Sequence, residues 1–207
     1  MIHCNTDQAP WSHLSFEKLR HHMGEPPLHR PVTRFSIFYE PEALYVLFQV
    51  EDRYVKAVTD RYQGPVYQDS CVEFFFSPCP TVDKGYFNLE INCSGTALFE
   101  FHPADGQDRL LITEREFEEL TVVSSITGLV EREITSPVSW QVAFRLPWGV
   151  LSSYTKVTTP GPGVVWRGNF HKCADRSSHP HWLTWAPIDH PTPRFHLPYF
   201  FGFLHFT

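Results

Sequence analysis

The chain has 207 residues, of which 42% are hydrophobic, 19% charged and 15% aromatic. This composition is typical of a globular protein and excludes a disordered one, and the length suits one large all-β domain, so we expect residues 1–207 to form a single domain. The formal charge of −6, and the lack of any Lys/Arg run that could follow a phosphate backbone, exclude nucleic acid as an expected partner.

The start of the chain and its cysteines predict the cellular location. Residues 1–15 (MIHCNTDQAPWSHLS) contain neither a cationic leader nor an apolar signal segment, and no window approaches the roughly 18 apolar residues that a membrane span needs. Five cysteines, an odd number with irregular spacing, indicate reduced thiols rather than a disulfide framework. We therefore expect a cytoplasmic protein with no membrane partner.

The first predicted element is helical. Residues 12–23 (SHLSFEKLRHHM) resemble a short helix with Ser12 as its N-cap, inside an N-terminal extension that spans residues 1–30. A second short helix is predicted after Pro147 and Trp148, because proline suits the first turn of a helix. The 18 prolines of the chain leave little room for longer helices.

The remaining elements are predicted strands, because hydrophobic residues alternate with period two or form short apolar runs between turn residues. In ALYVLFQVED (43–52), for example, Leu44, Val46 and Phe48 share one face. The predicted strands are 33–40, 43–52, 70–77, 86–92, 95–102, 120–126, 140–147, 164–172, 181–187 and 200–206. About ten antiparallel strands with one or two short helices indicate an all-β fold, a two-sheet β-sandwich of the jelly-roll kind.

A glutamate inside an apolar run distinguishes the segment VYQDSCVEFFF (66–76). On a strand over 70–77, the residues at even positions from Val72 to Phe76 face the core, whereas Glu73 lies with Phe75 on the opposite face. The glutamate is therefore compatible with the fold, and the question is what its face is for.

The next strand, 86–92, adds aromatic, amide and carboxylate groups to the face that carries Glu73. The polar side chains expected on this surface are Glu73, Asn88, Glu90 and Asn92, and the aromatic ones that flank them are Tyr67, Phe75 and Tyr86. Such a mixture suits a sugar, because aromatic rings cover the apolar C–H face of a pyranose while carboxylates and amides bond its hydroxyls. The other interpretation is an ordinary solvated sheet face, and the residues alone leave both open.

The order of several segments is familiar. These segments are ALYVLFQVED, VYQDSCVEFFFSP, YFNLEINCSGTAL, WQVAFRLPWGVL, GNFHKC, HWLTWAP and FHLPYFFGFL. From about residue 31 to residue 206 the chain resembles the family-nine carbohydrate-binding modules, in particular the bacterial branch described as carbohydrate-binding family 9-like. The resemblance implies a DOMON-type β-sandwich that binds a saccharide at a chain end and catalyses no reaction.

The resemblance also implies roles for individual residues. The resemblance implies that a sugar ring is clamped between two aromatic side chains, which correspond here to Tyr67 and Phe195, although both positions depart from the Trp of the family. The family's carboxylate corresponds to Glu73 and a polar strand residue to Asn88. Structural calcium is common in the family, but no cluster of oxygen ligands in the sequence supports it, so we expect no cofactor.

Further residues are candidates for the same site by their position. Glu90 and Tyr86 share the face of Asn88, and Arg167 and Asn169 lie on one face of the predicted strand 164–172. A late segment, HWLTWAPIDHPTPRFHLP, adds Trp182, Trp185, His190 and His196, any of which could replace or block the clamp.

The residues also allow three kinds of chemistry other than sugar binding. The segment HKCADRSSHPH brings together His171, Cys173, Asp175, His179 and His181 within eleven residues, with His171, Cys173, His179 and His181 as the candidate metal ligands. These residue types suit Zn²⁺, but their spacing matches no standard zinc motif, and a plain polar loop is the alternative. The pair Glu73 and Glu90 suggests the acid and base of a glycosidase. His-ligated haem is the third. A sandwich whose degraded clamp binds a protein or a small metabolite is the alternative to a saccharide ligand.

Overall fold

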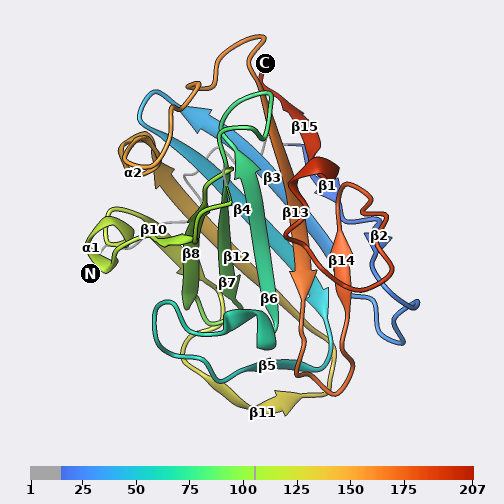
Figure 1. The fold of residues 1–207 in the computed structure, drawn as a ribbon. Helices are drawn as coiled ribbons and strands as arrows, with labels where there is room; N and C mark the ends of the chain where they lie inside the picture. Colours follow the sequence, from blue (N-terminus) through green and yellow to red (C-terminus); the bar gives the residue numbers. More distant parts are fainter. Residues whose placement is uncertain (1–14, 105) are drawn as a thin grey trace.

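The computed structural model describes residues 15–104 and 106–207, in which two antiparallel sheets pack face to face (Figure 1). The first sheet runs in the order β1 (Glu17–Lys18), β3 (Val32–Glu40), β4 (Ala43–Asp52), β12 (Val138–Pro147) and β10 (Thr121–Ser124). The second runs in the order β2 (His21–His22), β14 (Trp182–Thr184), β13 (Val165–Cys173), β6 (Cys71–Ser77), β7 (Tyr86–Asn92), β8 (Ala97–His102) and β9 (Leu110–Leu111). β15 (Gly202–His205) also pairs with β13, and β5 (Val55–Ala57) pairs with β11 (Val130–Ile134).

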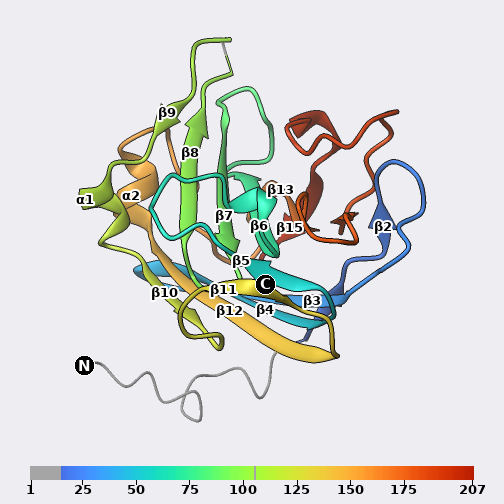
Figure 2. The ribbon, with the colours of Figure 1, turned by 90° about the horizontal axis from the view of Figure 1, so that it is seen from below.

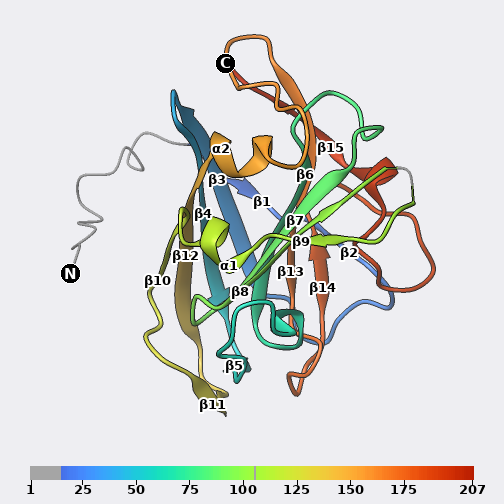
Figure 3. The same cartoon turned by 60° about the vertical axis from the view of Figure 1, so that its left-hand side comes forward.

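The two sheets form the layers of a sandwich. In Figure 2 the layer of β3, β4 and β12 lies below the layer of β6, β7 and β8, and Figure 3 shows the same two layers side by side. The predicted all-β antiparallel sandwich is confirmed, and each of the ten predicted strands has a counterpart within a few residues.

The helices agree only in part with the prediction. The helix expected after Pro147 is α2 (Trp148–Ser152), whereas α1 (Glu114–Phe117), which begins with a capping box between Thr113 and Glu116, was missed. Two 3₁₀ turns, η2 (Val66–Gln68) and η3 (Pro198–Phe200), were also missed. No helix in the described ranges has the length and apolar character needed to cross a bilayer.

The predicted helix over 12–23 is wrong for the residues that the structure describes, and Ser12 lies outside them. The segment instead supplies β1 to the first sheet and β2 to the second. The backbone N–H of Leu19 donates to Thr33 O at 3.0 Å, and that of Met23 donates to Trp182 O at 2.9 Å. Pairing with the edges of two sheets satisfies backbone groups that a helix would have bonded internally.

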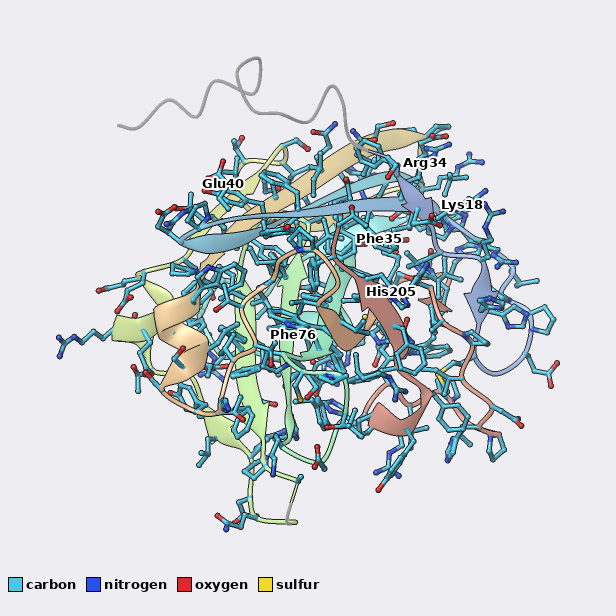
Figure 4. The ribbon with its side chains drawn as sticks, turned by 90° about the horizontal axis from the view of Figure 1, so that it is seen from above. Lys18, Arg34, Phe35, Glu40, Phe76 and His205 are labelled. Carbon is cyan, nitrogen blue, oxygen red and sulfur yellow. The ribbon has the colours of Figure 1, made fainter. Side chains whose placement is uncertain are left out.

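The core between the sheets is predominantly aromatic. Phe35 of the first sheet stacks on Phe170 of the second with ring centroids 3.6 Å apart, and Phe170 stacks on Phe74 at 4.5 Å. Figure 4 shows Phe35 and Phe76 between the layers, whereas Arg34 lies outside them. The predicted core face of β6 is therefore confirmed.

The opposite face of the second sheet is buried as well, so it is not an ordinary solvated face. All seven residues of β6 and all seven of β7 are buried. The proline-rich segment 186–201 lies on the side of this sheet away from the first sheet (Figure 3) and contributes Phe195 and Phe201 to a second hydrophobic cluster with Phe75. This cover creates a low-dielectric environment around every polar residue on that face.

A buried ion pair lies between the layers. Lys172 is fully buried, with Nζ 3.5 Å from Asp52 Oδ2 and 2.8 Å from His181 Nε2. Asp52 also pairs with His29 Nε2 at 2.8 Å and accepts from Trp140 Nε1 at 3.2 Å. Burial opposes ionisation of Asp52, but the charge of Lys172 and the hydrogen bond from His29 outweigh it and lower the pKa of this carboxyl.

Replacing Asp52→Asn leaves the Lys172 ammonium buried without a counter-charge, so we expect the free energy of unfolding near pH 7 to fall by about 3 kcal/mol. The folded-state pKa of Asp52 is depressed, so its stabilisation is present above the unfolded pKa of about 3.9 and is lost as the pH falls through the folded value. Urea unfolding should therefore show the deficit narrowing as the pH falls below the unfolded pKa of about 3.9. Glu51→Gln, at the exposed neighbouring position, should cost less than about 1 kcal/mol. An Asp52→Asn deficit as small as this control contradicts the prediction.

Candidate functional site

A cavity of about 310 Å³ opens on the covered face of the second sheet. Its floor consists of Glu73 and Phe75 on β6, Glu90 on β7, Leu98 on β8 and Cys173 on β13. The floor is therefore made of rigid strands from the centre of the sheet, whose positions are fixed on both faces by packing.

The walls of the cavity come from segments far apart in the sequence. Tyr67 of η2, Asp175 after β13 and Trp182 at the start of β14 form one side, Arg109 lies at another, and residues 193–196 complete the enclosure. A hollow of about 690 Å³ lies elsewhere on the described surface, and one of about 710 Å³ adjoins the cavity, with which it shares Trp182 and Pro193. Neither is lined by a buried carboxyl of the described residues, which makes the smaller cavity the best candidate.

The register of the strands brings two carboxyl groups together on the floor. Glu73 is the direct antiparallel partner of Glu90, and on its other side it is the partner of His171. Side chains at directly opposed positions have Cβ atoms about 5 Å apart. One oxygen of each carboxyl is bonded: Glu73 Oε1 accepts from Cys173 Sγ at 2.9 Å, and Glu90 Oε1 accepts from Asn88 Nδ2 at 3.0 Å.

The other oxygen of each carboxyl is buried without a partner. Among the described residues, neither Glu73 Oε2 nor Glu90 Oε2 has a hydrogen-bond partner, and both side chains line the cavity. Buried polar atoms in native proteins are nearly always bonded, so each such exception needs an explanation. Both ring nitrogens of the neighbouring His171 are likewise unpartnered.

Burial dominates the electrostatics of this floor. It raises the pKa of Glu90 to about 8, and, with the nearby Cys173 and Glu90, raises the pKa of Glu73 well above its ordinary value. Burial also lowers the pKa of His171 well below its ordinary value, so this imidazole is uncharged. The cavity therefore holds its acids and its base mostly in neutral form at neutral pH.

Hydrogen bonds join the residues of one wall of the cavity to one another. Trp182 Nε1 donates to Asp175 Oδ1 at 2.7 Å, and the backbone N–H of Asp175 donates to Tyr67 O at 3.2 Å. Asp69, which follows η2, accepts from the backbone N–H groups of Val58 and Thr59 at 3.1 and 3.0 Å. Tyr67 is thereby presented on an anchored turn, with 39% of its surface exposed.

Four of the eight sequence-predicted site residues meet at this cavity: Tyr67, Glu73, Glu90 and Phe195. Phe195 is only 8% exposed, and its ring stacks on His171 with centroids 4.0 Å apart. One face of this ring is therefore occupied by the protein itself. Of the later aromatic candidates, Trp182 and His196 line the cavity, whereas Trp185 packs against the core.

The other four predicted residues lie outside the lining. Asn88 donates to Glu90 and so fixes the orientation of that carboxyl, and Tyr86 Oη lies 3.0 Å from His196 Nδ1. Arg167 Nε donates to Phe201 O at 2.9 Å and Asn169 Nδ2 donates to Ala186 O at 3.1 Å. These last two side chains bind the backbone of the covering segment and its flanks.

The predicted metal cluster of His171, Cys173, His179 and His181 does not assemble, so this interpretation is wrong. Alternation along β13 places His171 and Cys173 on the covered face, whereas His181 contacts Lys172, which points into the core. His179 Nδ1 instead lies 2.9 Å from Ser178 Oγ.

A different group of potential ligands comes together at the floor. The donor atoms of Cys71, Glu73 and Cys173 all lie within 4.8 Å of one another. Two thiolates and a carboxylate could hold a thiophilic cation such as Zn²⁺. Burial raises the pKa of Cys71 to about 12 and that of Cys173 well above its ordinary value, so both thiols stay protonated in the empty site.

Comparison with known sequences identifies the family. The profile of carbohydrate-binding family 9 matches residues 11–206. The chain belongs to carbohydrate-binding family 9. The resemblance predicted from the segment order is thus confirmed over nearly the whole chain, whereas none of the curated proteins matches it significantly.

Solved structures share the fold of this family 9 chain. A protein from Bacteroides uniformis ATCC 8492, provisionally described as carbohydrate-binding, is 29% identical with a TM-score of 0.86, covering 95% of this chain and 88% of that one. A family 9 module from Caldicellulosiruptor kristjanssonii in complex with glucose is 15% identical (TM-score 0.62, 94% and 85% covered). The same module in complex with cellotriose is 14% identical (TM-score 0.62, 94% and 83% covered).

Sequence reasoning missed five residues that line the cavity of this family 9 domain: Leu98, Arg109, Asp175, Pro193 and Arg194. Asp175 belongs to the segment that carries the candidate metal ligands, seven residues before Trp182. Nothing in the sequence predicts that the two side chains meet, and only the fold brings them to one wall of the cavity. Leu98 and Arg109 gave no signal, because their position depends on how β8 and the following loop pack.

We expect Glu90→Gln to stabilise the ligand-free protein in a pH-dependent way. The folded-state pKa of Glu90, about 8, lies above the unfolded value of about 4.3, so the wild type loses stability as the pH rises between these values. The amide cannot ionise, and the variant should be more stable than the wild type by at least ~1 kcal/mol at pH 8, with a smaller difference at pH 5. Urea unfolding at both pH values measures this. Glu119→Gln, at an exposed site, is the control, and an equal difference at the two pH values refutes the assignment.

Proposed function

We propose that this family 9 domain is a non-catalytic binding module whose cavity takes one end of a saccharide. A sugar ring lies against Tyr67 and Trp182, and its polar groups reach the carboxyls of Glu73 and Glu90. The cavity volume of about 310 Å³ is near the lower end of the range of roughly 300–1,000 Å³ that is common for ligand sites.

The observation that carries this proposal is the pair of unpartnered carboxyl oxygens on the floor, next to an aromatic wall. Glu73 Oε2 and Glu90 Oε2 are buried, have no hydrogen-bond partner among the described residues, and belong to side chains that line the cavity. Sugar hydroxyls supply such partners, and the partly exposed ring of Tyr67 supplies a surface for the apolar face of the sugar.

The relatives support the same class of ligand. Family 9 is a family of carbohydrate-binding modules, and the module from Caldicellulosiruptor kristjanssonii, which shares the fold, was solved with glucose and with cellotriose. Its sequence identity of 14–15% supports the fold rather than particular contacts.

The arrangement of the two carboxyls argues against glycoside hydrolysis. A retaining glycosidase needs one ionised carboxylate as nucleophile and one protonated acid, so the two environments must separate the pKa values around neutrality. Here burial raises the pKa of both Glu73 and Glu90, and no strong cation is paired with either among the described residues. Binding without catalysis fits this pair better.

A second candidate ligand is a small polar metabolite rather than a sugar chain. The packing of Phe195 against His171 favours such a metabolite. Phe195 would have to leave this stacked position before it could serve as the second ring of an aromatic clamp. Calorimetry with glucose and cellotriose separates the candidates: binding of neither sugar, together with binding of a non-sugar metabolite, would support this alternative.

We expect Tyr67→Ala to weaken saccharide binding by about tenfold, or ~1.4 kcal/mol, through loss of the stacking surface. Tyr67→Trp should strengthen binding, because indole offers a larger face. Isothermal titration calorimetry with glucose and cellotriose measures both effects, and thermal unfolding confirms that the variants are folded. Tyr199→Ala removes an exposed aromatic residue that does not line the cavity and should leave the affinity unchanged. Equal affinities for all four proteins would exclude Tyr67 from the site.

A further inference from the structure

No cationic side chain among the described residues pairs with the two carboxyls on the floor. None of the ion pairs formed by the described residues includes Glu73 or Glu90, although both are at least 96% buried. Arg109 at the cavity mouth pairs with Glu100 instead, at 3.2 Å. Buried acids are normally paired or bonded on every oxygen, so an opposed pair with two free oxygens is costly unless a ligand satisfies it.

We propose that the saccharide bound here is an amino sugar, whose ammonium group lies between Glu73 Oε2 and Glu90 Oε2. This inference rests on the proposed function and names the ligand class for the same cavity. An ammonium offers three N–H donors, enough for both free oxygens, and no acceptor that would compete with them. One hydroxyl can donate to only one of the two oxygens, so a neutral sugar needs two hydroxyls to satisfy the pair and brings no positive charge to it.

The surroundings favour a positive group at this point. The wall adds a third carboxyl, Asp175, whose pKa burial also raises, and the neighbouring imidazole of His171 is uncharged. The two arginines at the cavity, Arg109 and Arg194, stand at exposed positions rather than on the floor. In a water-poor cavity a charge-assisted hydrogen bond is about twice as strong as a neutral one, which makes the charge decisive for affinity.

An ammonium ligand would also displace a proton. The charged or titratable groups around the pair are Cys71 on β6, Glu100 and His102 on β8, His171 and Cys173 on β13, Asp175 after it, and Arg109, Arg194 and His196 around the mouth. Of the two opposed acids, Glu90 has a pKa of about 8 in the empty cavity and is largely protonated at neutral pH. A cation beside it lowers that pKa, and the proton passes to the buffer.

The test is calorimetry near neutral pH with D-glucosamine, D-glucose and N-acetyl-D-glucosamine, in buffers of different ionisation enthalpy and with a chelator present to remove metal. An amine with a pKa of about 8 is mostly charged at about pH 7. We expect glucosamine to bind at least ~10-fold more tightly than the two neutral sugars and to release protons on binding. Neutral sugars should release none.

Substitutions of the two glutamates test where the ammonium group lies. In Glu90→Gln and Glu73→Gln the ratio of the glucosamine affinity to the glucose affinity should fall toward one, whereas Tyr67→Ala should weaken both sugars and keep the ratio. A ratio near one in the wild type overturns the amino-sugar inference and leaves saccharide binding intact. A preference that survives both Gln substitutions overturns the assigned position of the ammonium. Failure of all three sugars to bind contradicts the proposed function together with this inference.

Discussion

The site depends on the burial of a sheet on both of its faces. One face of β6 and β7 packs on the first sheet in the usual way of a sandwich, and the segment 186–201 covers the other with Phe195 and Phe201. A sheet face that met water would hold Glu73 and Glu90 as ordinary surface carboxylates. Under this cover they become neutral acids with raised pKa values, and the remaining gap becomes a cavity.

Apart from the 3₁₀ turn η3, the covering segment 186–201 contains no helix or strand, and side chains of the sheet hold it in place. Asn169 bonds both the N–H and the C=O of Ala186, and Arg167 bonds Phe201 O. His171 stacks beneath Phe195. These three residues lie on the covered face of β13 and therefore hold the covering segment in place. This explains why their positions are polar although none of the three lines the cavity.

The sequence predicted the sandwich well because alternation is a local signal. It placed Val72, Phe74 and Phe76 in the core, and it placed Glu73 on the opposite face next to the strand that carries Glu90. It could not show that this second face is covered, because a proline-rich segment without periodicity gives no indication of what it packs against. The metal cluster was wrong for a related reason: short spacing in a sequence does not bring residues together when a strand turns alternate side chains to opposite faces.

The pairing of residues 17–23 bears on where this domain begins. Resemblance to family 9 modules was evident from about residue 31, and the preceding residues looked like a separate extension. Yet β1 borders one sheet and β2 the other, and Leu19 and Met23 belong to the two different hydrophobic clusters. This short stretch joins the two layers at one edge. A domain boundary drawn from the familiar motifs alone would therefore remove two strands that belong to the sandwich.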